Sequence, residues 1–237
     1  MSHPHTDIVT LQHCARLIDA SELELVRFVW CDTHGQTRGK TLTRKAALHA
    51  LTHGVGMVST LMLKDTSDRT AYKVFEPHIG QTLPGFEFAN NLLLQPIAES
   101  FRILPWAHQT GWIQCQPVFE HGGTVPLDTR LQLQKALQLL ATHGLTMRCG
   151  LEIEFHIYKL RDAEHGPDAD PALAAWPGLA PEVSLIHPGY NLLSESWFDR
   201  AEAPLRIVQK TAEGLGLPLS SLEIELGPSQ VEAVFDA

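Results

Sequence analysis

The order of apolar and polar residues predicts a chain of alternating helices and strands. Apolar residues at helical spacing from about residue 8 to residue 18 predict an amphipathic helix, and alternation over residues 23–30 predicts a strand. Asp and Gly within residues 32–36 are typical of a tight turn, so a hairpin is expected there. Thr43 can cap a short helix that ends at Gly54.

Several short apolar runs follow this helix and are expected to form strands. They cover residues 57–63, 91–94, 101–104 and 112–116. Together with the hairpin and the helices, they predict a small α+β domain over residues 1–122, which ends at the turn His121-Gly122-Gly123.

The second half of the chain, residues 123–237, is also expected to be α+β. Asp128 begins a strongly periodic helix, and a long strand is expected over residues 147–158. Residues 161–189 are rich in Pro, Gly, Ala and Asp, which predicts an exposed loop. A helix over residues 203–213, with Pro204 in its first turn, leads to two acidic strands separated by Gly227-Pro228-Ser229.

The acidic strands carry the informative pattern. Side chains two apart on a strand share a face, so Glu152 and Glu154 point the same way, as do Glu223 and Glu225. By the same rule Gln230 shares a face with Glu232. If these strands are neighbours, up to five carboxylates converge and raise one another's pKa unless a positive charge lies between them.

A divalent cation would supply that charge. Oxygen-only ligands favour Mg²⁺ or Mn²⁺ over zinc, which prefers the His and Cys that the cluster lacks. The alternative is that alternating acidic and apolar residues form the solvated face of a half-exposed strand. His156 shares the face of Glu152 and Glu154, although a histidine on a strand more often makes structural hydrogen bonds.

Composition and charge exclude several classes of protein. The 44% apolar and 19% charged residues are those of a folded chain rather than a disordered one. The formal net charge of −9 opposes attraction to nucleic acid. No apolar run is long enough for a membrane span and the first residues lack a signal-peptide pattern, so a cytoplasmic location is expected. The four cysteines lack a CxxC pair and are expected to be reduced.

The acidic strands resemble the metal-binding strands of the glutamine synthetase family. The residues concerned are Glu-Ile-Glu-Phe at 152–155 and Glu-Leu-Gly-Pro-Ser-Gln-Val-Glu at 225–232. Residues 26–40 resemble the hairpin that opens the family's β-grasp domain, and Phe-Arg-Ile-Leu-Pro-Trp at 101–106 resembles another of its segments. The resemblance covers essentially the whole chain in the same order.

This resemblance implies a fold and an activity. The fold would be an N-terminal β-grasp domain over residues 1–122, followed by the first half of the catalytic antiparallel barrel over residues 123–237. Glu154, Glu225 and Glu232 would hold one Mg²⁺ or Mn²⁺, and Glu152 would contribute to a second ion. The reaction would use ATP to convert the γ-carboxylate of glutamate to an acyl phosphate, which ammonia or another amine then attacks.

Two departures from the family modify this expectation. Asn90-Asn91-Leu92 and Pro96-Ile97 replace the Ser-Asp-Met and Pro-Asp of many ammonia-using members, so ligation to a larger amine is an alternative. The sequence stops at Ala237, before the segments that supply further metal, glutamate and phosphate ligands in the family. Little ligase turnover is therefore expected from this chain alone, and no catalytic or nucleotide-binding residue is assigned.

The resemblance also bears on partners. Family members form rings in which one subunit's first domain completes its neighbour's site, which implies a homo-oligomer for an intact member. A rival hypothesis is a non-catalytic module that binds a metal ion or docks on a full-length relative. An unrelated metal-dependent hydrolase would need the acidic strands without a β-grasp domain, and the hairpin at residues 26–40 argues against it.

Overall fold

The structure, a computed structural model, describes residues 10–73, 83–86, 90–161 and 181–237. The chain forms two compact units, Met1–Met147 (unit 1) and Arg148–Ala237 (unit 2). Within the described ranges, no helix is long and apolar enough to cross a membrane. The four cysteines are free thiols, as expected. The domain boundary expected at residue 122 stays a prediction.

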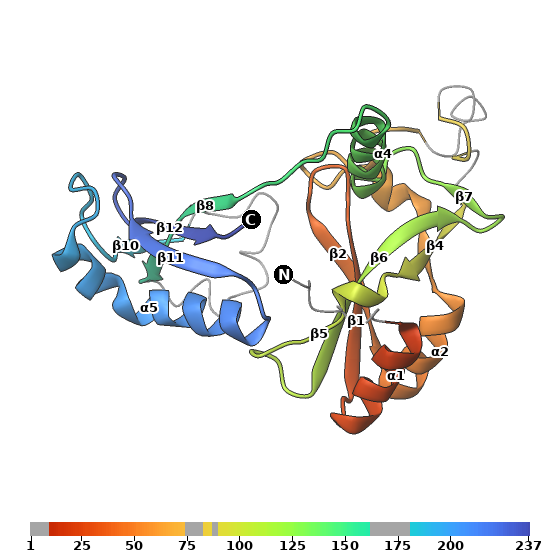
Figure 1. Ribbon diagram of the computed structural model, residues 1–237, viewed down its shortest axis with the longest axis horizontal. Helices are drawn as coiled ribbons and strands as arrows, with labels where there is room; N and C mark the ends of the chain where they lie inside the picture. Colours follow the sequence, from red (N-terminus) through yellow and green to blue (C-terminus); the bar gives the residue numbers. More distant parts are fainter. Residues whose placement is uncertain (1–9, 74–82, 87–89, 162–180) are drawn as a thin grey trace. The chain divides into compact units, whose positions relative to one another are not determined.

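Unit 1 is built on a mixed sheet in which β1 runs parallel to β6 and the other pairs are antiparallel. The strand order is β2-β1-β6-β4-β3, with β5 and β7 paired to β6 (Figure 1). The strands are β1 (Leu25–Cys31), β2 (Thr37–Thr43), β3 (Val55–Val58), β4 (Asn91–Pro96), β5 (Arg102–Ile103), β6 (Thr110–Phe119) and β7 (Gly123–Thr124). The predicted hairpin is confirmed by the pairing of β1 with β2.

Helices α1 and α2 pack with the sheet of unit 1 around one core (Figure 1). Val26, Phe28 and Trp30, at alternate positions of β1, are buried in it. Among the described residues of unit 1, the helical elements are α1 (Leu11–Ala20), α2 (Arg44–His53), α4 (Thr129–Thr142) and the 3-10 helices η1 (Ser59–Leu63) and η2 (Ala98–Ser100). The predicted end of α2 at Gly54 is confirmed, and this residue has φ of 73°.

One strand prediction in unit 1, for residues 57–63, is only partly correct. The apolar run at residues 57–63 contributes the end of β3 and then turns into η1. Ser59 and Met62 are both buried, and their spacing of three places them on one side of a 3-10 helix. A continuous apolar run does not distinguish these two structures.

Unit 2 contains a three-stranded antiparallel sheet in the order β11-β12-β8, and a second sheet in which β9 pairs with β10. Helix α5 packs against β11, and Ala201, Leu205, Ile224 and Val231 form the buried core (Figure 1). The elements are β8 (Leu151–His156), β9 (Tyr158–Leu160), β10 (Val183–Leu185), α5 (Glu195–Gly214), β11 (Leu219–Ile224) and β12 (Gln230–Phe235). The predicted pair of acidic strands is confirmed.

The strand expected over residues 147–158 is shorter than predicted. It begins at Leu151 and is interrupted at Ile157, whose N–H donates to the carbonyl of Ser229 at 3.0 Å, beyond the end of the β8–β12 ladder. Strand β10 lies within residues 161–189, which were expected to be loop. Residues 162–180 of that segment lie outside the described residues.

The last helix starts eight residues earlier than predicted. Ser194 is its N-cap, and the Ser194 hydroxyl accepts the N–H of Trp197 at 3.4 Å. Pro204 therefore lies inside α5 rather than in its first turn, where its ring leaves one backbone hydrogen bond of the helix unmade. The proline misled the prediction because a helix start is its most common position in a helix.

Candidate metal centre

The register of the three-stranded sheet aligns the acidic residues across neighbouring strands. Glu232 on β12, the central strand, lies opposite Glu154 on β8 and opposite Glu223 on β11. Glu225 follows β11 and continues its ladder, because its N–H donates to the Gln230 carbonyl at 3.0 Å. Alternation then places all four carboxylates on one face, while Val231 and Ile224 point into the core on the other face.

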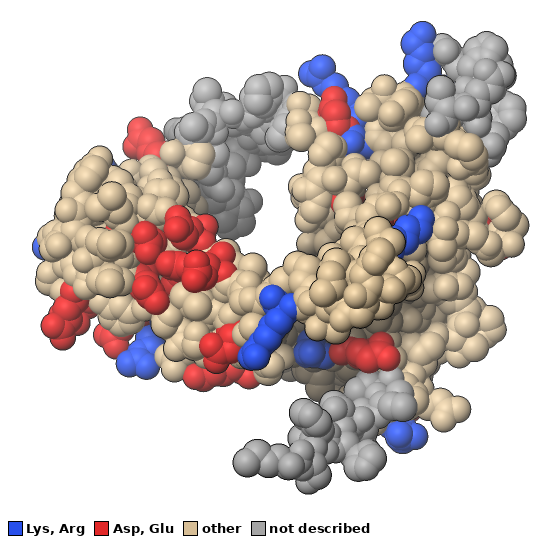
Figure 2. Space-filling view, turned by 45° about the horizontal axis from the view of Figure 1, so that its top comes forward, with Lys and Arg blue, Asp and Glu red and all other residues tan. Residues whose placement is uncertain are grey.

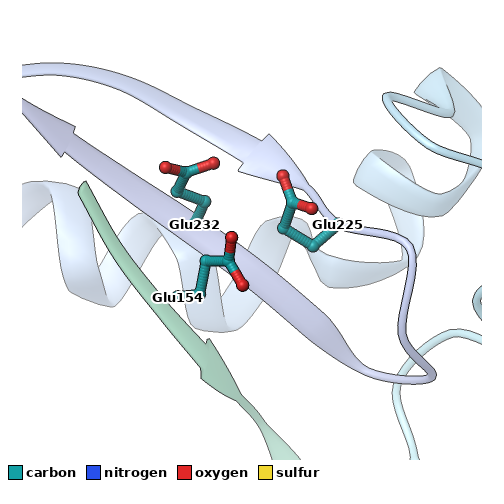
Figure 3. Close-up of side chains that lie close together, drawn as sticks. All are labelled: Glu154, Glu225 and Glu232. Atoms are coloured by element: carbon teal, nitrogen blue, oxygen red, sulfur yellow. The ribbon is translucent and has the colours of Figure 1, made fainter.

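Three of these carboxylates converge, as Figure 3 shows for Glu154, Glu225 and Glu232. Each has an oxygen within 4.8 Å of an oxygen of the other two. Glu154 is exposed, Glu225 is half-buried and Glu232 is only 8% exposed. Figure 2 shows acidic side chains gathered on the surface of unit 2. The expectation that these strands are neighbours is confirmed, and the predicted three-residue ligand set is brought together.

Glu152 and Glu223 flank the three converging carboxylates. Glu152 lies opposite Val234, one step along the same face of β8, and its charge acts on Glu232. The Glu223 carboxylate accepts a hydrogen bond from the Ser221 hydroxyl at 2.7 Å. Neither residue joins the group of three, so the structure places Glu152 beside the group rather than in it.

The electrostatics of the cluster are unfavourable without a cation. Burial raises the pKa of Glu232, and a hydrogen bond with Glu225 and the negative charges of Glu152, Glu225 and Glu223 raise it further. Within the described part of the chain, no lysine or arginine forms an ion pair with these five glutamates. The cluster therefore concentrates negative charge that no lysine or arginine among the described residues of unit 2 neutralises.

The donor set fits a hard divalent cation. Mg²⁺ binds oxygen at about 2.0–2.1 Å and Ca²⁺ at about 2.3–2.6 Å, so two ligand oxygens around one such ion are at most about 4–5 Å apart. The oxygens of the cluster lie within 4.8 Å of one another, which is inside the limit of about 5.2 Å for Ca²⁺ and slightly wider than the limit of about 4.2 Å for Mg²⁺, so a bound Mg²⁺ would draw them together. Carboxylates without nitrogen or sulfur ligands suit Mg²⁺ or Mn²⁺ better than Zn²⁺.

Three further residues surround the cluster. Gln230 donates from Nε2 to Oε2 of Glu154 at 2.7 Å, a contact that the shared face of Gln230 and Glu232 could have suggested. Buried His187 contacts the Gln230 carbonyl at 3.1 Å, and no sequence pattern pointed to it. His156 is not in the cluster. Its Nδ1 donates instead to the Pro228 carbonyl at 2.9 Å, so it makes the structural hydrogen bond expected of a strand histidine.

Comparison with known proteins identifies the class to which this fold and this cluster belong. Residues 126–237 match the family model "Glutamine synthetase, catalytic domain". The solved structure titled "Apo GmaS without ligand" superposes with a TM-score of 0.65 at 20% identity, covering 94% of this chain and 44% of that one. A second, "Crystal structure of novel glutamine synthase homolog", gives 0.62 at 19% identity, with 90% and 43% covered. The mixed α+β fold is therefore that of glutamine-synthetase-like proteins.

Two curated relatives point to the same class of protein. Gamma-glutamylanilide synthase of an Acinetobacter species is 31% identical over 225 residues, which cover 92% of this chain and 44% of the relative. Gamma-glutamylethanolamide synthetase GlnA4 of Streptomyces coelicolor is 28% identical with the same coverage. The chain belongs to the glutamine synthetase family and is close to its gamma-glutamyl-amine ligases. It spans 44% of the length of each of these two relatives.

Proposed function

We propose that unit 2 carries a divalent-cation site of a glutamate–amine ligase, with Glu154, Glu225 and Glu232 as the ligands of one Mg²⁺ or Mn²⁺. The observation that carries this proposal is the convergence of three carboxylates, from β8, from β12 and from the residue after β11, with no lysine or arginine of the described residues paired to them. A solvated acidic strand, the alternative, does not require carboxylates from different strands to meet, nor a buried Glu232. Glu152 is proposed to contribute to a second ion.

The proposed reaction joins the γ-carboxylate of glutamate to an amine, with ATP as co-substrate and an acyl phosphate as intermediate. A divalent ion held by Glu154, Glu225 and Glu232 would supply charge neutralisation during such a transfer. The part of this chain is to hold the ion, through carboxylates fixed on a sheet that is packed on its other face. Rigid placement of ligands is what in-line phosphoryl transfer requires.

The amine is proposed to be larger than ammonia. Asn90-Asn91-Leu92 differs from the pattern of ammonia-using members, and the two relatives described above are named for anilide and ethanolamide products. Residues 1–122 are proposed to be the β-grasp domain, which the mixed sheet packed with α1 and α2 supports. Residues 123–237 are proposed to be the first part of the catalytic barrel, and the intact protein a homo-oligomer.

Titration with Mn²⁺, followed by the loss of the electron paramagnetic resonance signal of free Mn²⁺, tests the metal site. The 237-residue chain is expected to bind Mn²⁺, and Glu154→Gln, Glu225→Gln and Glu232→Gln are each expected to weaken that binding. Glu202→Gln is the matched control, because Glu202 is exposed on α5 and pairs with Arg206. The proposal is wrong if the wild-type chain and the three variants bind Mn²⁺ equally.

A second assay separates the ligase from a non-catalytic module. Metal binding is compatible with both hypotheses, but phosphate release that depends on ATP and glutamate together would exclude the non-catalytic module. Such release would also refute the expectation of little turnover from this chain alone. Where it is found, ethanolamine or aniline should stimulate it more than ammonia, and preference for ammonia would contradict the proposed amine.

A further inference from the structure

Gln230 connects two of the proposed metal ligands through both its side chain and its backbone. Its Nε2 donates to Oε2 of Glu154 at 2.7 Å, and its Oε1 accepts the N–H of Gly227 at 2.8 Å. Its backbone carbonyl accepts the N–H of Glu225 at 3.0 Å. A Cβ on Gly227 would lie 2.4 Å from Oε1 of Gln230, so the glycine leaves the room that this amide needs. A single side chain thus fixes Glu154 relative to the turn that carries Glu225.

His187 contacts the same backbone carbonyl of Gln230. His187 is 1% exposed, its Nδ1 accepts the N–H of Gly189 at 3.2 Å, and its Nε2 lies 3.1 Å from the Gln230 carbonyl. An acceptor at Nδ1 assigns the ring proton to Nε2, which therefore donates to that carbonyl. In this arrangement the ring is neutral and both of its nitrogens are used.

The segment around His187 lies directly against the turn between β11 and β12. Ser229 donates its N–H to the His187 carbonyl at 3.0 Å, and the Ser229 hydroxyl accepts the N–H of Ile186 at 2.9 Å. Tyr190 donates its N–H to the Leu226 carbonyl at 2.8 Å. Gly189 has φ of 77°, and a Cβ there would lie 2.6 Å from the nitrogen of Pro228. The approach is therefore too close for any other residue at this position.

We infer that Gln230 and His187 are positioning residues of the metal centre, which hold Glu154 and Glu225 in their converging orientation. Three carboxylates repel one another and would separate without something to hold them. A lysine or arginine would hold them but would also neutralise the charge that attracts the ion. A neutral amide and a neutral imidazole fix the ligands without competing with the cation. This inference rests on the proposed metal site.

The test compares Mn²⁺ affinity with thermal stability in the full 237-residue chain. Gln230→Ala is expected to weaken Mn²⁺ binding about 10-fold, since loss of a residue that orients a metal ligand costs about 10–100-fold. His187→Ala should weaken it similarly, and His187→Gln, which keeps a donor near Nε2, should recover part of the loss. Leu205→Ala is the control: Leu205 is buried in the core on the opposite face, so this variant should lower the melting temperature and leave Mn²⁺ affinity within about twofold.

The possible outcomes distinguish a positioning role from general destabilisation and from the absence of a metal site. If wild type binds Mn²⁺ and Gln230→Ala binds it equally well, the positioning role is wrong while the metal site stands. If affinity falls in Leu205→Ala as much as in Gln230→Ala, the effect is general destabilisation and the inference is overturned. If wild type and Glu232→Gln both fail to bind Mn²⁺, the proposed metal site itself is wrong, and the inference with it. His187→Ala could fail to fold, but Gln230 is only partly buried, so its variant keeps the test decisive.

Discussion

Asp32 in unit 1 and Glu232 in unit 2 are both buried carboxylates, 1% and 8% exposed, but their surroundings are opposite. Asp32 accepts the N–H groups of His34 and Gln36, each at 2.9 Å, and Nε of Arg38 donates to it at 2.8 Å. Burial alone would raise the pKa of Asp32, but the hydrogen bonds and the charge of Arg38 outweigh it and lower the pKa below its usual value. Glu232 has other glutamates as neighbours, and its pKa is raised.

The difference in surroundings distinguishes a carboxylate with a structural role from one that is suited to act as a metal ligand. Asp32 is satisfied by groups of the chain itself, and it fixes the turn between β1 and β2. Glu232 is buried beside like charges, an arrangement that costs stability unless a cation joins it. Burial of a carboxylate is therefore informative only together with what surrounds it.

The largest effect is expected from Asp32→Ala. This change leaves Nε of Arg38 and two backbone N–H groups without their acceptor, which should lower the free energy of unfolding of unit 1 by about 3 kcal/mol. Urea denaturation followed by circular dichroism measures it. Asp32→Asn keeps an acceptor for the backbone and should lose less, so equal losses in the two variants would show that the charge of Asp32 alone stabilises the turn.

Glu232→Gln should strongly weaken the binding of metal. In the metal-free protein it should raise stability, whereas Asp32→Ala lowers it. Removing one charged ligand should weaken Mn²⁺ binding by about 100-fold or more, because affinity for hard cations depends on ligand charge. The metal-free variant should melt at a higher temperature than wild type, since the repulsion is relieved. Glu223→Gln is the matched control on the same face, and equal loss of affinity there would indicate a diffuse acidic patch instead of a defined site.

The contributions of Asp32 and Glu232 to stability are expected to depend on pH in opposite directions. The folded pKa of Asp32 is lowered, so its stabilising contribution is present above the ordinary aspartate pKa and is lost as the pH falls through the folded value. The folded pKa of Glu232 is raised, so in metal-free protein its contribution is present below the ordinary glutamate pKa and is lost as the pH rises through the folded value. Melting temperatures of wild type, Asp32→Asn and Glu232→Gln between pH 3 and 8 would measure both, and parallel profiles would contradict the comparison.

The smallest effect is expected from Asp68→Asn. The Asp68 carboxylate accepts from Nη2 of Arg38 at 2.7 Å, but its side chain is 63% exposed. An exposed ion pair of this kind contributes about 0.5 kcal/mol and is screened by salt. Urea denaturation at low and high ionic strength should show a small loss that disappears in salt, and a loss as large as that of Asp32→Ala would mean that Arg38 depends on both carboxylates equally.

Local signals in the sequence predicted much of the fold. The period-2 pattern around Glu154 and Glu232 predicted which side chains share a face, and Gly54 predicted the end of α2. The interruption at Ile157 and the early start of α5 were missed. Ile157 bonds to a residue 72 positions away, a contact without any local pattern, and Pro204 gave a misleading local signal.

For the candidate site too, local patterns predicted the residues on the strands but not the contacts made by distant segments. The three converging carboxylates followed from alternation combined with the family resemblance, because strands that pair in register bring equivalent positions together. His187 could not be found this way, because it lies in a segment without periodicity and reaches Gln230 only through the folded turn. The role of Asp32 was recognised only as that of a turn residue, although Arg38, six positions later, carries the compensating charge.

The central position of β12 has a consequence for sequence change in this region. Its residues alternate between the acidic face, with Glu232, and the core, with Val231 and Ala233, while both of its edges are paired. Inserting or deleting one residue within the strand would exchange the two sets, turning a carboxylate toward α5 and a valine toward water. An insertion or deletion in β12 is therefore expected to be more damaging than a substitution, because every residue of the strand after the change would point to the wrong face of the sheet.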